Sequence, residues 1–203
     1  SAWLMKNKLY EQYIYDGAGR RSVVETRSAQ GDSLLGTRTT LYDETDTWSE
    51  LYTYETGLNT QAPGYLNDAF LNKLAFWHGD AIAYIQHDAL GSILGPTDSN
   101  GFLPEEAALR QYSDYGELLN PDESNVPLTD GYTGYQHDAY TGIEYARNRY
   151  YDASVGAFIS SDPHPINHKD LLDLHRYAYV QANPTNMTDP LGLYPVSNGM
   201  NTN

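Results

Sequence analysis

The sequence of 203 residues contains no cysteine, few basic side chains and only 4 phenylalanines. Without cysteine there can be no disulfide, no thiolate catalysis and no cysteine-based zinc site. The lack of cysteine does not determine the cellular compartment, since a large secreted domain can be stable without disulfides. No apolar run is long enough to span a bilayer, and residues 1–15 lack the pattern of a signal peptide. Because the chain starts with Ser1-Ala2-Trp3, we expect it to be a fragment of a longer protein.

The charge is strongly acidic, with 12 basic and 27 acidic residues and a formal net charge of −15. Such a surface repels phosphate backbones and anionic lipids, so we expect no binding to nucleic acid or to a membrane surface. A basic partner or a basic cargo suits this charge better.

Tyrosine is the residue in excess, with 19 copies beside 17 glycines. Tyrosine favours pleated, half-buried surfaces because its large ring ends in a hydroxyl group that stays hydrated. Alternating strands run into turns that hold an acidic residue and often a glycine, and this hairpin pattern recurs in degenerate repeats. The composition and the repeats together predict a mostly β chain built of stacked hairpins. The acidic turns begin at Tyr15-Asp16, Tyr42-Asp43, Tyr54-Glu55, His87-Asp88, His137-Asp138 and Tyr151-Asp152.

Two segments break the β pattern. Gly64–Leu74 carries apolar residues at the spacing of a helical stripe, and Asn167 is a suitable N-cap for a second helix that ends near Arg176. Residues 104–108 also resemble a helix start, but the alternation that follows them favours a strand. Residues 194–203 have no core-forming content, so we expect a loose tail.

Two Asp-Pro pairs supply the candidate chemistry, at Asp162-Pro163 and Asp189-Pro190. Two carboxyl groups that a fold brings together can share one proton and hydrolyse a peptide bond. On the residues alone, each pair is more simply a turn opener, because aspartate caps backbone amides and proline favours the bend.

Four side chains near the first pair, those of His164, His168, Asp173 and His175, suggest a metal site at first sight, since residues 168 and 175 are two helical turns apart. Pro165 separates His164 from the others and interrupts any common helix, and there is no pair at the usual ligand spacing. We therefore expect neither a metal nor another cofactor.

An ordered series of short motifs runs from Gly131 to Leu193. It consists of Gly134-Tyr135-Gln136-His137-Asp138, 141–152, Phe158-Ile159-Ser160-Ser161-Asp162-Pro163, 176–180, Asn183-Pro184 and Asp189-Pro190-Leu191-Gly192-Leu193. This series resembles the repeat-associated core of the Rhs / YD-repeat proteins, and the upstream tyrosine-acid units resemble the repeats that precede that core. Ala153, Ala157 and the run His164-Pro165-Ile166 depart from the family pattern.

The resemblance implies a ribbon of β-hairpins that forms part of a shell around a C-terminal toxin or other cargo. Residues 1–130 would be the repeats, residues 131–193 the inward-curling core with one or two short helices, and residues 194–203 a tail.

In the family, two core aspartates cut the chain after the last leucine of the Asp-Pro-x-Gly-Leu motif. Carried over by position, Asp162 and Asp189 would be catalytic, and Leu193–Tyr194 would be the bond that is cut. Pro190 and Gly192 would shape the motif, and Arg147 or Arg149 would tune the acids. The reaction would run once per chain.

The resemblance also implies partners and a location. The remaining repeats of the shell, the C-terminal cargo and components of a secretion apparatus or toxin complex would contact this chain, and the whole would be secreted. Two alternatives stay open at this stage. The chain could be a shell fragment without catalysis, or a cell-surface adhesion module whose tyrosine rows bind carbohydrate.

Overall fold

The computed structural model has almost all of its regular structure in β-strands. Within the part of the chain that it describes there is no α-helix and no helix long and apolar enough to cross a membrane. The predicted mostly β fold is confirmed. The described residues are 3–6, 9–30, 32–42, 50–56, 64–67, 73–78, 81–103, 109–120, 130–138, 141–163 and 174–197.

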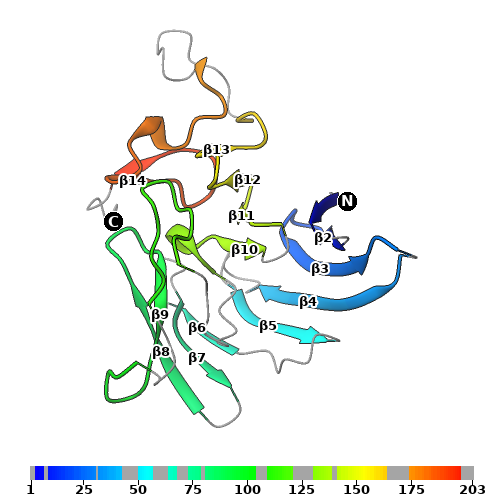
Figure 1. The fold of residues 1–203 in the computed structure, drawn as a ribbon, viewed down its shortest axis with the longest axis vertical. Coiled ribbons are helices and arrows are strands. Elements are labelled where there is room, and N and C mark those ends of the chain that lie inside the picture. The colour runs from blue at the N-terminus through cyan, green and yellow to red at the C-terminus, as the bar shows by residue number, and fades with distance from the viewer. Residues whose placement is uncertain are drawn as a thin grey trace.

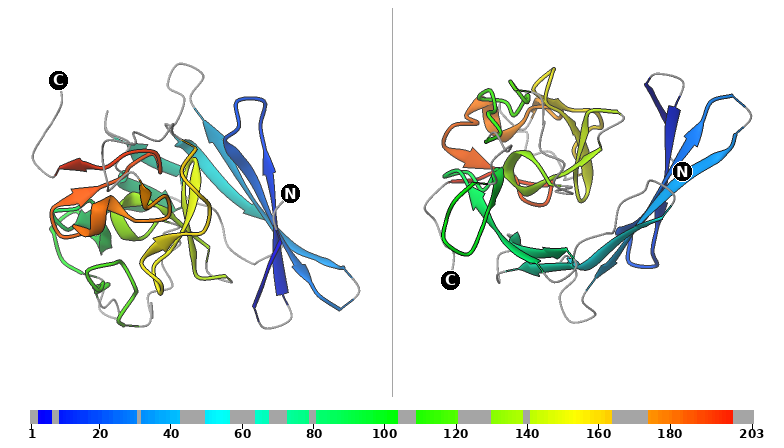
Figure 2. Two further views of the ribbon diagram at one scale, coloured as in Figure 1. Left: turned by 90° about the horizontal axis from the view of Figure 1, so that it is seen from above. Right: turned by 60° about the horizontal axis from the view of Figure 1, so that its bottom comes forward.

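The first half of the chain forms one antiparallel sheet whose nine strands follow one another in sequence order (Figure 1). Hairpins join neighbouring strands, so every strand pairs with its neighbours in the sequence, as a repeated hairpin ribbon requires. The sheet curves, and the later part of the chain lies on its concave side (Figure 2). The strands are β1 (Trp3–Lys6), β2 (Leu9–Tyr15), β3 (Arg21–Ser28), β4 (Leu34–Tyr42), β5 (Glu50–Thr56), β6 (Gly64–Asn67), β7 (Lys73–His78), β8 (Ala81–His87) and β9 (Ile93–Thr97).

Aspartates that follow a strand close the turns of the repeats. Asp16 Oδ1 accepts hydrogen bonds from the amides of Ala18 and Arg20, both at 2.9 Å. Asp88 and Asp98 bind the amides two and four residues further on in the same way, at 2.8 to 2.9 Å. The repeated tyrosine-acid unit is therefore a strand followed by an aspartate-capped turn. The turns also use glycines with φ between 81° and 84°, namely Gly19, Gly91 and Gly101.

The last third of the described chain forms two smaller sheets and two 3-10 turns. The four-stranded sheet, which we call the core sheet, rests against the nine-stranded sheet (Figure 2). Its strands are β10 (Gln136–Asp138), β11 (Ile143–Ala146), β12 (Arg149–Asp152) and β13 (Ala157–Phe158). The other elements are η1 (Tyr132–Gly134), η3 (Val180–Ala182), β14 (Met187–Thr188) and β15 (Val196–Ser197).

Buried tyrosines fill the centre of this region. The rings of Tyr151 and Tyr179 lie 4.6 Å apart between centroids, and Phe158 packs against both. The hydroxyl group of Tyr132 donates to the Asp114 carbonyl at 2.8 Å, and that of Tyr151 donates to a carbonyl of the same loop. Tyrosine can serve as a core residue here because each of these hydroxyl groups reaches a backbone acceptor.

Arg21 fastens the nine-stranded sheet to the core sheet. Its guanidinium is fully buried and donates to Asp138 Oδ2 at 2.5 Å and to Gln136 Oε1 at 2.8 Å. The rings of Tyr13 and Tyr145 lie on its faces, with centroids 5.0 and 4.3 Å from Cζ. A buried cation with hydrogen bonds and aromatic neighbours is well compensated, so β3 and β10 are held in a fixed position relative to each other.

The helix expected over Gly64–Leu74 is wrong. Gly64–Asn67 and Lys73–His78 are the strands β6 and β7, and Tyr65 pairs with Phe76 across them. Both of these aromatic side chains are buried while Leu66 is exposed, which is the alternation of a strand rather than a helical stripe.

The other two expected helices, over residues 104–108 and from Asn167 to Arg176, fall mainly outside the described residues.

The tail expected to be loose is partly ordered. Val196 pairs with Thr188 and Ser197 with Met187, so β15 adds an antiparallel partner to β14. These backbone contacts were not visible in the composition of the tail. Residues 198–203 lie outside the described part.

We expect Gly116→Ala to lower the free energy of unfolding by about 3 kcal/mol, because backbone strain and a clash add together. Gly116 has a φ of 87°, and an added Cβ would lie 2.3 Å from the Tyr132 ring. Gly19→Ala is the matched control, since Gly19 has a φ of 81° but no atom within 4 Å of an added Cβ. It should cost about 1 kcal/mol. Urea denaturation of the three proteins measures both losses, and equal losses would contradict the packing of Tyr132 described here.

Candidate functional site

The turn between β11 and β12 binds the Asp-Pro-Leu-Gly-Leu motif. Three consecutive residues donate to three consecutive carbonyl groups: Arg147 Nη1 to Pro190 at 2.5 Å, Asn148 Nδ2 to Leu191 at 2.9 Å, and Arg149 Nε to Gly192 at 2.5 Å. The motif is therefore held along its backbone, by side chains that are 43 residues away in the sequence.

Gly192 fits this turn only because it has no side chain. Its φ is 66°, and an added Cβ would lie 2.5 Å from the Ala146 carbonyl oxygen and 3.2 Å from the Arg149 nitrogen. Any larger residue would push the motif away from β11 and β12.

Asp189 folds the chain back on itself after the motif. Its Oδ1 accepts hydrogen bonds from the amides of Leu193 at 2.9 Å and Tyr194 at 3.1 Å. The Tyr194 nitrogen belongs to the Leu193–Tyr194 peptide bond, so this carboxylate contacts the bond predicted to be cut. The Asp189 carbonyl in turn accepts a 2.5 Å hydrogen bond from the Tyr135 hydroxyl group.

One guanidinium joins the two aspartates. Arg149 Nη2 lies 3.0 Å from Asp189 Oδ2, and Arg149 Nη1 lies 3.1 Å from Asp162 Oδ2. The Phe158 ring lies below the guanidinium, 3.6 Å from Cζ to its centroid. The side chains of Asp189 and Arg149 are 2% and 4% exposed, whereas that of Asp162 is 23% exposed. Asp162 is thus the member of the pair that water reaches more easily.

Burial raises the pKa of Asp189 above its ordinary value. The amide hydrogen bonds from Leu193 and Tyr194 and the charge of Arg149 oppose this effect without cancelling it. Asp189 is consequently easier to protonate than an exposed aspartate.

The structure brings every predicted site residue into one region: Asp162, Asp189, Pro190, Gly192, Leu193, Tyr194, Arg147 and Arg149. The two acids meet through a shared cation, and a proton shared between them stays a prediction.

Sequence reasoning missed two contacts of this site. Asn148 and Tyr135 both hold the motif through its backbone. The sequence carried one usable signal for this site, and it concerns Arg149. In a strand that contains the buried Tyr151, a residue two positions earlier points to the same face, so Arg149 is expected to be buried as well.

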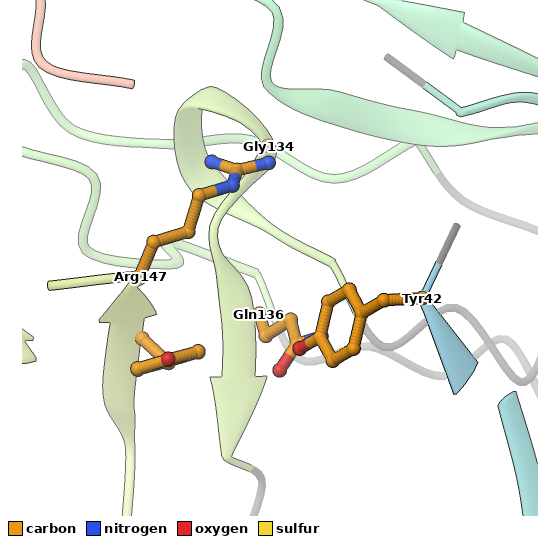
Figure 3. Close-up of a pocket in the computed structure, with 5 residues that line it drawn as sticks. Tyr42, Gly134, Gln136 and Arg147 are labelled. Atoms are coloured by element: carbon orange, nitrogen blue, oxygen red, sulfur yellow. The ribbon is translucent and has the colours of Figure 1, made fainter. Parts of the chain in front are cut away.

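A shallow pocket lies beside the site, between the nine-stranded sheet and the core sheet. Tyr42, Gly134, Gln136, Tyr145 and Arg147 line it. Figure 3 shows Tyr42 beside Gln136, while the Arg147 side chain extends toward the loop at Gly134. Arg147 therefore lies between this pocket and the motif it binds through Pro190.

The described residues hold no group of three or more histidine, aspartate or glutamate side chains arranged to bind a metal ion. Of the histidines considered for a metal site, His175 is described, whereas His168 lies outside the described ranges.

No family model matches the chain. The tRNA3(Ser)-specific nuclease WapA of Bacillus spizizenii is 32% identical to it over 198 residues, which are 92% of this chain and 8% of WapA. A crystal structure of TcdB2-TccC3-Cdc42 matches 91% of this chain and 9% of the other, with a TM-score of 0.66 and 24% identity. A structure of the Photorhabdus luminescens Tc holotoxin pore with a mutated TccC3 matches 94% of this chain and 9% of the other, with a TM-score of 0.65 and 24% identity.

The chain thus spans only 8% to 9% of the length of these three proteins. Its sequence is similar to part of a WapA nuclease. The solved structures share its antiparallel β fold over 91% to 94% of the chain.

We expect Arg149→Gln to lower the free energy of unfolding by about 3 kcal/mol at neutral pH, because it leaves Asp189 buried without its cation. The loss should shrink as the pH falls, since the pKa of Asp189 rises further in the variant and the carboxyl group is neutralised sooner.

Arg147→Gln is the control for this prediction. It removes a neighbouring arginine that donates to a carbonyl group rather than to a carboxylate, and it should cost less than about 1 kcal/mol. Denaturant unfolding at several pH values measures both variants. A pH-independent loss for Arg149→Gln, or equal losses for the two variants, would contradict the buried ion pair.

Proposed function

We propose that this chain is the C-terminal segment of an Rhs-type toxin shell, and that its core cuts the chain once, after Leu193. The contact between Arg149, Asp162 and Asp189 carries the proposal, because it gathers two acids beside the Leu193–Tyr194 bond. The WapA and Tc likenesses support the assignment to a toxin shell.

The proposed reaction is hydrolysis of the Leu193–Tyr194 bond by an aspartyl pair. Asp162, the more exposed member, takes a proton from water, whose oxygen attacks the Leu193 carbonyl carbon. Asp189, whose raised pKa favours the protonated form, gives its proton to the carbonyl oxygen. The tetrahedral intermediate then collapses. Asp162 passes its proton to the Tyr194 nitrogen, the carbon–nitrogen bond breaks, and one hydroxyl proton returns to Asp189.

The arginines would position the reacting segment in this scheme. Arg147 and Arg149 hold the carbonyl groups of Pro190 and Gly192, so the bond that is cut cannot move away from the acids. Holding the target on the same chain replaces the binding step of a separate protease. Before cleavage Arg149 has to yield part of its contact with Asp189, because a protonated carboxyl group no longer attracts the cation.

The wider assignment follows the same proposal. Residues 1–130 are repeats of the shell, residues 131–193 are the core, and the segment after Leu193 leads to the cargo. The partners are the remaining repeats, the cargo and components of a toxin complex or secretion apparatus, and the assembly is secreted. The name of WapA describes a nuclease, but the matched part is 8% of that protein, so we propose no nuclease activity for this chain.

A second candidate function is a structural shell segment that is not cut. The favouring observation is that Arg149 pairs with both aspartates, and a salt bridge to each is what two ionised carboxylates in a structural role would make.

Intact-mass spectrometry of the purified chain tests the proposed cleavage. We expect a species that ends at Leu193, and we expect only full-length chain in Asp162→Asn and in Asp189→Asn, because each variant removes one proton carrier. Asp152→Asn is the matched control: this aspartate caps a nearby turn through Ser154 and lies outside the site. It should be cut like the parent chain.

Preparing the protein in H₂¹⁸O sharpens this test. Hydrolysis by water places one heavy oxygen in the new Leu193 carboxyl group. Full-length masses for the parent and for all three variants would reject the protease and leave the structural shell segment. Cleavage that persists in both site variants would show that Asp162 and Asp189 are not the catalytic pair.

A further inference from the structure

Two carboxyl groups are buried at the joint between the nine-stranded sheet and the core sheet, away from the candidate protease site. Glu11 comes from the middle of β2 and Asp138 from the end of β10, and they are 1% and 0% exposed. Glu11 Oε2 accepts a 3.2 Å hydrogen bond from the Tyr13 hydroxyl group, and Asp138 Oδ2 accepts from Arg21.

The second oxygen of each carboxyl group has no hydrogen-bond donor. Both Glu11 Oε1 and Asp138 Oδ1 are buried without a partner within the described part of the chain. Arg38 Nη1 lies 3.8 Å from Asp138 Oδ1, which is an ion-pair distance but not a hydrogen bond. Leaving a buried acceptor unsatisfied is costly, and a proton on Glu11 would remove one of the two buried negative charges.

The groups that face Glu11 come from four strands. Tyr13 lies on β2 itself, Arg21 on β3, Arg38 on β4 and Asp138 on β10. With both acids ionised, two anions and two cations are buried or largely buried together. Arg21 is already committed to Asp138 and Gln136, so it cannot fully compensate Glu11 as well.

We propose that Glu11 keeps a proton in the folded chain at this joint, and that the loss of this proton loosens the core sheet from the nine-stranded sheet. The joint is then tight in mild acid and weaker above neutral pH. If the chain is part of a shell, as proposed above, a rise in pH would weaken the contact between the core sheet inside and the nine-stranded sheet of the wall.

The electrostatics agree with this assignment. Burial raises the pKa of Glu11 to about 7, the charge of Asp138 adds to the rise, and Arg38 and Arg21 oppose it. A raised acid pKa means that the folded chain keeps a proton that the unfolded chain releases. The resulting stability is complete below the unfolded value of 4.5 and is lost as the pH rises toward 7.

Thermal and urea unfolding of the whole chain between pH 4.5 and 8.5 tests the proposal. For each proton involved, the folding constant changes by up to about tenfold per pH unit, so the titration of Glu11 between pH 4.5 and about 7 should lower the folding constant of the parent chain by about three hundredfold. Glu11→Gln cannot ionise and should lack this component, and it should exceed the parent in stability above pH 7. Because His137, Glu144 and Asp189 also titrate with raised pKa values, the difference between variant and parent is the quantity to compare.

Glu25→Gln is the matched control. It makes the same chemical change on the neighbouring strand, where Glu25 pairs with Arg27 and is partly exposed. Its stability should follow the pH dependence of the parent. A Glu11→Gln variant whose difference from the parent does not change with pH would overturn the proposal.

A second measurement applies even if Glu11→Gln does not fold. The parent chain is labelled with ¹³C at the carboxyl carbons of its glutamates. Glu11 should then titrate near neutral pH, well above the glutamates that lie on the surface. Titration of Glu11 near the ordinary value for a glutamate would overturn the proposal. Neither measurement depends on Asp162, Asp189 or cleavage, so the outcome is independent of the proposed protease.

Discussion

The guanidinium of Arg149 is the contact on which the described C-terminal structure depends most. It binds two carboxylates and a backbone carbonyl group that come from two separate segments of the chain, around Asp162 and within residues 189–193, and it rests on an aromatic ring. A single buried cation with this many partners positions all of them at once, because moving one would leave the charge uncompensated. The same contact gathers the two acids at the bond after Leu193, so the architecture and the proposed chemistry share one origin.

Arg21 plays a comparable part at the joint with the nine-stranded sheet. Like Arg149, it is buried, pairs with an aspartate and has aromatic rings on its faces. The chain has 19 tyrosines: Tyr13 and Tyr145 supply the rings that face Arg21, while the hydroxyl groups of others, Tyr132 and Tyr151, bind backbone carbonyl groups. Inside this acidic protein, the buried charges of Arg21 and Arg149 are thus paired with aspartates and lie against aromatic rings.

The sequence was sufficient for the repeated hairpins, because their cause is local. Asp16, Asp88 and Asp98 cap turns through amides two and four residues away, and such contacts are visible in the spacing of aspartate and glycine. The helix expected over Gly64–Leu74 was wrong for the opposite reason. A helical stripe and a pair of short strands can carry the same apolar residues, and the pairing of Tyr65 with Phe76 decides between them.

The candidate site shows the same division. The ordered resemblance was enough to group Asp162, Asp189 and the Leu193–Tyr194 bond, and the structure brings these residues together. It did not reveal that a guanidinium stands between the acids, nor that Asn148 and Tyr135 hold the motif. The contacts to the motif join residues 40 or more positions apart, and no local pattern encodes them.

A double-mutant cycle between Arg149 and Asp189 tests the central claim most directly. The free energies of unfolding of the parent, Arg149→Gln, Asp189→Asn and the double variant give the coupling energy between the two side chains. The structure predicts a coupling energy of at least about 1.5 kcal/mol. Losing Arg149 is costly because it leaves the Asp189 carboxylate buried without a cation, and Asp189→Asn removes that charge. Losses that simply add, within about 0.3 kcal/mol, would show that the buried ion pair does not exist in solution.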